Sequence, residues 1–217
     1  MLYSKPKNFL FLRVPKTAST SINAQILDRL TERDITIQTS ISYEDMKIPS
    51  INSFNDVSNY HPTLKELITF DIIKEEDLSK LNIYAVIREP IDRIISCAHH
   101  FCAEHPHAKF VLKLNKSTNI LPNDLVVEAL FNFSDLDESL DLSKPQVDWL
   151  VYKNYIVNKL FKYNDIDKMI KEICCDESLK YNFRSKYRND KSQSLSFELQ
   201  QECRKRYPED FAMWESL

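Results

Sequence analysis

Hydrophobic and polar positions follow one another along the chain in a pattern that predicts strands separated by helices. Short apolar runs typical of buried strands occupy residues 8–14 (NFLFLRV) and 83–87 (IYAVI), and a β-branched run at 35–40 (ITIQTS) predicts a further strand. Residues 155–163 (YIVNKLFKY) also favour a strand. Helical patterns are expected at residues 20–31, 62–70, 89–105, 122–133, 144–152, 165–175, 194–206 and 207–215.

Strands that alternate with helices are typical of a parallel sheet with helices on both faces. We therefore expect an α/β fold with three layers, a parallel sheet flanked by helices, and a P-loop-like core. A length of 217 residues without an evident repeat or long linker predicts a single domain over residues 1–217. Ligands of such sheets bind beyond the carboxyl ends of the strands. The turns at residues 14–21 and 88–96 have this position.

The composition is ordinary for a globular protein except in glycine. Hydrophobic residues make up 43% and charged residues 28%, enough for a core. There are 0 glycines, so we expect turns that need a positive φ to use Asn and Asp. A net charge of −3 argues against a general nucleic-acid partner. Two basic stretches, 183–191 and 203–207, are either a solvated helix face or the rim of an anion site.

The cysteine count and the hydropathy pattern indicate in which cellular compartment the protein is expected. Five cysteines, an odd number without regular spacing, do not form a disulfide framework, which indicates a reducing environment. No stretch approaches the roughly 20 apolar residues of a membrane span. The first residues, MLYSKPKNFLFLRV, turn polar too quickly for a signal peptide. We expect a cytoplasmic protein without a membrane span.

The first turn, RVPKTASTS at residues 13–21, carries the chemistry of an anion site. Backbone N–H groups at a helix start lack partners inside the helix and point at one spot. Ser19, Thr20 and Ser21 can add hydroxyl donors, and Lys16 adds a positive charge. The alternative is an ordinary N-cap, where Ser and Thr are favoured without any ligand.

The second turn, VIREPIDRIIS, follows the apolar run at residues 83–87. Arg88 closes that run, where an unpaired charge would be costly, and Ser96 lies two turns into the next helix. Both can contribute to a second anion site. The alternative is a surface arginine paired with Glu89 or Asp92, which is common and weak.

A cluster of histidines and cysteines at residues 97–107 (CAHHFCAEHPH) has a metal-like composition. Its spacing fits no zinc pattern, and the adjacent His99 and His100 face different ways on a helix. We expect exposed polarity at a helix end and no metal site.

The two turns together resemble the paired signature of sulfotransferases that use 3′-phosphoadenosine 5′-phosphosulfate (PAPS). The segment RVPKTASTS is especially similar to heparan sulfate 2-O-sulfotransferase and its uronyl relatives. The resemblance is close over residues 8–30 and 83–101 and looser in NYHPTLKEL, PQVDWL and the C-terminal part. It implies a PAPS-dependent sulfotransferase with a P-loop-like sulfotransferase core and adenosine 3′,5′-bisphosphate (PAP) as product.

The resemblance also implies roles for individual residues. Lys16 would contact the bridging or sulfuryl oxygen, and Arg88 and Ser96 would hold the 3′-phosphate. A basic loop at KYRNDK, with Arg188 and Lys191, would close over the nucleotide. The loop residues that would surround the 5′-phosphate are Thr17, Ala18, Ser19, Thr20 and Ser21.

His61 is the expected general base, because a neutral imidazole is suited to taking a proton from an alcohol. It precedes an expected helix, as the catalytic histidine does in relatives. Relatives of the 2-O type carry two histidines one residue apart, whereas this chain has HPT, with Thr63 at the second place. Glu66 is the alternative base. Since Lys16 supplies a cation for the leaving oxygen, no metal is required.

The expected acceptor is a hydroxyl on a carbohydrate, either a glycan or a small molecule. Two alternatives remain open at the level of sequence. A nucleotide kinase or NTPase shares the strand–loop–Lys–helix order, although the GK[ST] signature is missing. A catalytically inactive relative that binds a nucleotide or a glycan would share the fold.

Overall fold

The computed structural model describes residues 1–38, 61–104, 108, 123–136, 141–181 and 194–217. The chain divides into two compact units, each of which is made from separate segments. The first unit takes residues 1–87, 146–184 and Leu217, and the second takes residues 88–145 and 185–216. The single domain expected from the sequence stays a prediction.

The first unit is built on a five-stranded sheet with the strand order β3-β1-β2-β4-β7. The strands β2 (Phe9–Phe11), β4 (Asn82–Ile87) and β7 (Lys159–Lys162) are parallel, which confirms the predicted parallel sheet. At one side, β1 (Leu2–Ser4) runs antiparallel to both β2 and β3 (Ile37–Gln38). The strand β1 was not expected from the sequence, and its three residues are too few to show a period.

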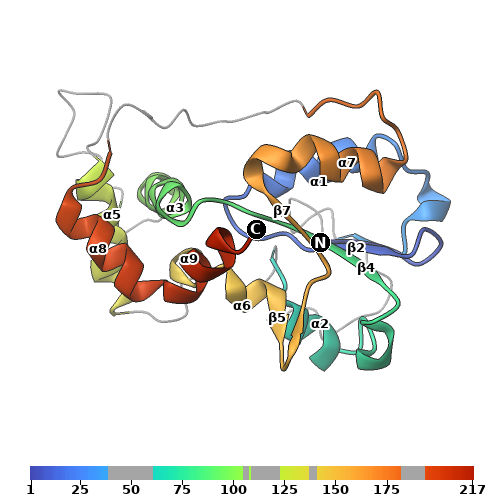
Figure 1. Ribbon diagram of the computed structural model, residues 1–217, viewed down its shortest axis with the longest axis horizontal. Helices are drawn as coiled ribbons and strands as arrows, with labels where there is room; N and C mark the ends of the chain where they lie inside the picture. Colours follow the sequence, from blue (N-terminus) through green and yellow to red (C-terminus); the bar gives the residue numbers. More distant parts are fainter. Residues whose placement is uncertain (39–60, 105–107, 109–122, 137–140, 182–193) are drawn as a thin grey trace. The chain divides into compact units, whose positions relative to one another are not determined.

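Helices cover both faces of this sheet (Figure 1). On one face, α1 (Ser19–Leu27) packs beside α7 (Ile166–Cys174), and on the other lie the short helices α2 (Leu64–Thr69) and α6 (Val147–Leu150). This is the predicted three-layer arrangement. The buried side chains on the face of α1 and α7 are Leu2, Phe9, Phe11, Ile22, Ile26, Tyr84, Val86, Ile166, Met169, Ile170 and Ile173.

The segment that was expected to form one strand over residues 155–163 forms two. Residues 155–156 pair in a hairpin as β6 (Tyr155–Ile156) with β5 (Val151–Tyr152), which also shortens the helix predicted at 144–152. Asn158 then interrupts the run: its Oδ1 accepts from Ile83 N at 2.8 Å and its Nδ2 donates to Leu81 O at 2.9 Å. These bonds align the chain for β7 alongside β4.

The second unit is helical and confirms the predicted helices within the described residues. It contains α3 (Pro90–Glu104), α5 (Asn123–Ser134), α8 (Phe197–Arg206) and α9 (Pro208–Glu215). Their apolar sides form one core that includes Ile94, Ala98, Phe101, Val127, Leu130, Cys203 and Phe211. Short 3-10 helices within the described residues are Glu32–Asp34, Glu75–Asp77, Asp141–Ser143 and Tyr163–Asp165.

Two polar contacts fix the direction of α8 against α5. Near the start of both helices, Asp124 Oδ1 accepts from Ser196 N at 3.0 Å. Near their ends, Arg206 donates to both carboxylate oxygens of Asp135 at 2.7 and 3.0 Å. The two helices are therefore parallel.

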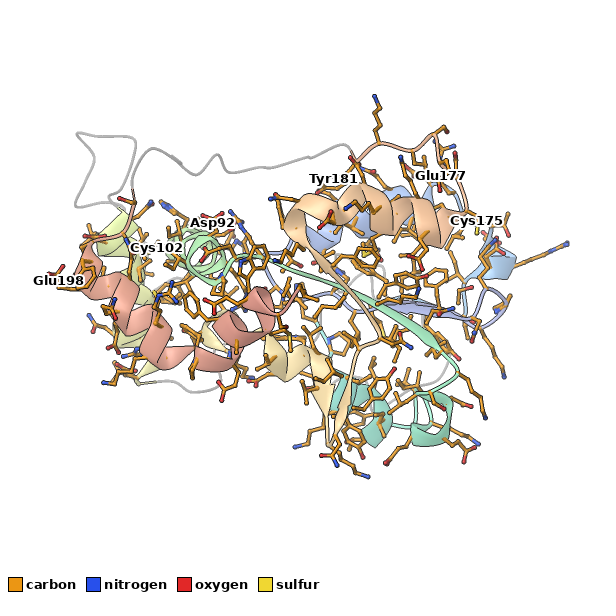
Figure 2. All side chains as sticks on the ribbon, in the orientation of Figure 1. Asp92, Cys102, Cys175, Glu177, Tyr181 and Glu198 are labelled. Carbon is orange, nitrogen blue, oxygen red and sulfur yellow. The ribbon has the colours of Figure 1, made fainter. Side chains whose placement is uncertain are left out.

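Among the described residues of this glycine-free chain, residues other than Asn and Asp take most of the positive φ angles. Asn8 and Asp71 meet the expectation, but Lys16, Ala18, Lys153 and Cys175 also have φ between 53° and 66°. The expectation that Asn and Asp would fill these places is therefore wrong in part. Cys175 is the left-handed residue that ends α7 (Figure 2), a place that glycine usually takes. None of the five cysteines forms a disulfide.

Candidate functional site

The turn after β2 leads directly into α1. Leu12 N donates to Tyr84 O at 2.8 Å, which continues the pairing of β2 with β4 beyond the strand. The chain then reverses through left-handed angles at Lys16 (φ 66°) and Ala18 (φ 63°), and α1 begins at Ser19. Ala18 is the N-cap residue and has no side-chain group that can cap the helix. Its side chain therefore caps no N–H group of α1, and N–H groups at a helix start are suited to binding an anion.

The two left-handed residues are strained. For a residue with a Cβ, this conformation costs roughly 1–2 kcal/mol relative to the right-handed one. Such strain persists where the surrounding structure enforces it, and it is concentrated at functional sites. The loop therefore has the tight path of a phosphate-binding loop, although Lys and Ala occupy places that glycine would fill without strain.

The hydroxyl groups of the loop have different surroundings. Thr17 is buried, and its Oγ1 donates to Val14 O at 2.9 Å, so this side chain holds the loop together from inside. Ser19 is also buried, Ser21 is half-buried and Thr20 is exposed. Of the hydroxyls predicted to contact a phosphate, that of Thr20 is the most accessible to a ligand.

Arg13 is a member of this site that the sequence interpretation did not select. Its side chain is only 2% exposed, and its Nη2 donates to Thr20 Oγ1 at 2.9 Å. Burial lowers the pKa of Arg13 to about 10, so the guanidinium remains a cation at neutral pH. The available signal was an arginine directly after the apolar run NFLFL, a position where burial is expected.

His61 lies against the same loop, although it is 48 residues from Arg13 in the sequence. Its Nδ1 is 2.6 Å from Arg13 O. A carbonyl oxygen can only accept a hydrogen bond, so Nδ1 carries the proton and the lone pair of the neutral ring is on Nε2. The structure therefore brings the predicted base and the predicted anion loop together within the first unit.

A tryptophan holds the backbone of His61. Trp149 of α6 is 1% exposed, and its Nε1 donates to His61 O at 2.6 Å. The sequence interpretation missed this contact as well, because it joins residues 88 positions apart.

The last residue of the HPT segment, Thr63, caps the helix that follows His61. Thr63 is the N-cap of α2 and accepts from Glu66 N at 3.1 Å, while Glu66 Oε2 accepts from Thr63 N at 2.7 Å. This reciprocal pair is a capping box. Thr63 and the alternative base Glu66 are thus both engaged at the start of α2.

The second predicted anion site belongs to the second unit. Arg88 follows the last residue of β4, its side chain is 14% exposed, and its Nη2 is 3.9 Å from an oxygen of Asp92. Asp92 lies on the first turn of α3 (Figure 2), where its N–H donates to Glu89 Oε2 at 2.7 Å. Ser96 is half-buried on α3. The pairing with Asp92 is long for a salt bridge.

Two predicted nucleotide contacts, Arg188 and Lys191, lie outside the described residues. The histidine cluster is described in part: His99 Nε2 is 2.8 Å from Asn123 Oδ1, and the amide oxygen accepts, so this nitrogen carries a proton. The described part of the chain contains no group of three or more His, Cys, Asp or Glu side chains arranged to hold a metal ion.

A parallel sheet with a tight loop before α1 and an imidazole beside that loop suits a transferase that handles an anionic substrate. The family model described as the sulfotransferase family matches residues 1–215, nearly the whole chain. The protein therefore belongs to the sulfotransferase family, whose enzymes transfer sulfuryl groups. No curated protein and no solved structure gives a significant match. Among the described helices, none has the length and apolar character needed to cross a membrane.

Proposed function

We propose that this protein transfers the sulfuryl group of PAPS to a hydroxyl of a carbohydrate acceptor. The observation that carries the proposal is the 2.6 Å contact between His61 Nδ1 and the carbonyl of Arg13. The motif and the base were predicted from separate parts of the sequence, and this contact joins them. It supports a site in which a proton acceptor lies next to an anion-binding loop.

The residues of the loop fit a phosphosulfate. The groups that can face a ligand are the ammonium of Lys16, the hydroxyl of Thr20 and the backbone N–H groups at the start of α1, and all of these are donors or cations. Arg13 adds a further positive charge behind Thr20. Ala18 offers only its backbone, and Thr17 supports the loop through Val14.

Bound PAPS supplies an activated sulfuryl group with a phosphate as its leaving group. His61 would receive the proton of the acceptor hydroxyl on Nε2, because Nδ1 is already protonated. The acceptor oxygen forms its bond to sulfur as the bond from sulfur to the departing phosphate oxygen breaks. Lys16 would neutralise the charge that develops on that oxygen, a role that a metal ion has in phosphoryl transfer.

Arg88 and Ser96 are proposed to bind the 3′-phosphate of the nucleotide. The assignment rests on the sequence motif VIREPIDRIIS. The closeness to heparan sulfate 2-O-sulfotransferase is likewise a proposal from the motif RVPKTASTS. The replacement of a second histidine by Thr63, now seen to cap α2, distinguishes this chain from those relatives.

A ligand comparison tests the proposal. PAP should stabilise the protein far more than AMP, by about 2.7 kcal/mol at a hundredfold excess over Kd, because only PAP carries a 3′-phosphate. Arg88→Ala should remove most of the difference, and Lys80→Ala, at an exposed lysine, should keep it. Mass spectrometry of a carbohydrate panel incubated with PAPS should reveal a sulfated product. Equal affinity for AMP and PAP, or a panel without any sulfated product, would contradict the proposal.

A further inference from the structure

We propose that Arg13 and Trp149 are positioning residues that tie the anion loop to the ring of His61, so that occupation of the loop and orientation of the base are coupled. The inference rests on the proposed function for its meaning, because it treats His61 as the base. The contacts themselves are independent of any substrate. Four elements of the first unit meet in them: the segment after β2, the start of α1, the segment before α2, and α6.

Trp149 and Arg13 hold His61 at two ends. The indole Nε1–H of Trp149 fixes the backbone carbonyl of His61 at 2.6 Å, and the carbonyl of Arg13 fixes ring atom Nδ1 at 2.6 Å. Pro62 follows and restricts the chain further, since its ring fixes its own φ. A residue held at both its carbonyl and its ring nitrogen has little freedom to rotate. Its Nε2 therefore keeps one direction, and the neutral ring keeps one tautomer.

Arg13 is the link to the loop because it acts through two groups. Its carbonyl accepts from His61, and its guanidinium donates to Thr20 Oγ1 at 2.9 Å. The side chain is buried, so it acts on a ligand through Thr20. The bond from Arg13 uses a lone pair of Thr20 Oγ1 and leaves the hydroxyl proton to be donated to an anion.

The peptide of Arg13 is enclosed by bonds on both sides. Leu12 N donates to Tyr84 O at 2.8 Å, and Val14 O accepts from Thr17 Oγ1 at 2.9 Å. A segment held in this way moves as a unit. An anion that draws Thr20 toward it therefore acts on Arg13, and through the carbonyl of Arg13 on the His61 ring.

Nitrogen NMR of histidine-labelled protein tests the positioning directly. His61→Gln identifies the signals of His61, and we expect the neutral ring to be protonated on Nδ1. Trp149→Phe keeps a buried aromatic ring and removes the N–H donor. It should lower the Nδ1-protonated fraction and reduce kcat about tenfold, with PAP affinity within about twofold. A wild-type ring protonated on Nε2, or a Trp149→Phe ring unchanged in tautomer and kcat, overturns the proposal.

A matched pair at Thr20 tests the coupling. At saturating PAP the His61 signals of wild type should shift, and Thr20→Ser, which keeps the hydroxyl, should shift alike. Thr20→Val, which keeps the shape but loses the acceptor for Arg13, should lose most of this shift. Equal shifts in both variants overturn the coupling.

The same spectra separate this inference from the proposed function. If PAP has no effect but pyrophosphate moves the His61 signals through Thr20, the coupling stands and the nucleotide assignment fails. If neither anion moves them, the coupling is overturned. Unlike kcat, the NMR spectra require no turnover, so they remain decisive even if no acceptor is sulfated.

Discussion

Ala18 shows at the scale of one residue how the loop differs from a glycine-rich one. Its φ of 63° is left-handed, and it directly precedes α1. Ala18→Gly should relieve strain of roughly 1–2 kcal/mol, offset by about 0.5–1 kcal/mol of chain entropy. We expect a net gain of up to about 1.5 kcal/mol in the free energy of unfolding, measured with urea.

The matched control for this change is Ala24→Gly, within α1. Ala24 is helical and half-buried, so glycine there should destabilise by about 1 kcal/mol. A loss at Ala18 as large as the loss at Ala24 would show that the loop is not strained at Ala18.

His61 is the residue on which the chemical step depends. His61→Ala should lower kcat by about 10²–10⁴ and leave PAP affinity nearly unchanged. A base acts when it is deprotonated, so kcat/KM of wild type should have an acid limb on which it rises with pH as His61 loses its proton. That limb should be absent in the variant. A lower melting temperature with unchanged turnover per folded molecule would instead make His61 structural.

The sequence could indicate candidate residues whose type carries the chemistry, and their roles stay predictions. Lys16, Thr20 and His61 were selected because a cation, a hydroxyl and an imidazole have uses at a helix start or in proton transfer, and the structure places them in one unit. Arg13 and Trp149 could not be selected in this way. Their contacts are made to backbone and side-chain atoms that only the folded chain brings near.

At the scale of elements, Asn158 joins β7 to β4. Its amide makes two hydrogen bonds to the backbone around the start of β4, one to Ile83 and one to Leu81. Asn158→Ala should lower the free energy of unfolding by about 1–3 kcal/mol, because each bond contributes about 0.5–1.5 kcal/mol. Chemical denaturation measures the change.

Asn154 provides the comparison, since it is an exposed residue in the turn between β5 and β6. Asn154→Ala should change stability by less than about 0.5 kcal/mol. Equal effects at the two positions would mean that the bonds of Asn158 contribute nothing to the sheet.

The elements that the sequence predicted well are those with several turns or a long apolar run. The helix α3 and the strand β4 match their predicted ranges closely, because each has enough residues to show a period or a buried run. The prediction of one strand over residues 155–163 was wrong because this run contains two strands with different partners. The strand β6 pairs with β5, and β7 pairs with β4. The polar Asn158 between them was the available signal, but it marks a break only when its partners in β4 are known.

For the whole molecule, the proposed role of Lys16 predicts an activity that does not depend on metal. EDTA should leave turnover unchanged, because the ammonium of Lys16 neutralises the leaving oxygen. Lys16→Ala should lower kcat strongly while the melting temperature stays close to that of wild type. Activity that disappears with EDTA and returns with Mg²⁺ would favour a kinase, and return with Zn²⁺ would indicate the histidine cluster.

The alternation of strands and helices predicted the α/β fold, but nothing in the sequence marked the division into two units. The passages between the units, at residues 87–88, 145–146, 184–185 and 216–217, carry no glycine-rich or proline-rich linker. The first passage falls where β4 ends, within the segment that was interpreted as one binding turn. Such a division depends on which helices share a core, and this is decided by packing.

The interleaved order of the two units has a consequence during translation. When Ile87 leaves the ribosome, β4 can pair with β2, but its other partner, β7, has not been made. At about 5–20 residues per second, β7 follows several seconds later, after α3 and α5 of the other unit. Throughout that interval the growing chain presents an apolar strand with one open edge, a target for chaperones. Nascent chains arrested between α5 and β7 should therefore be the ones most prone to aggregate.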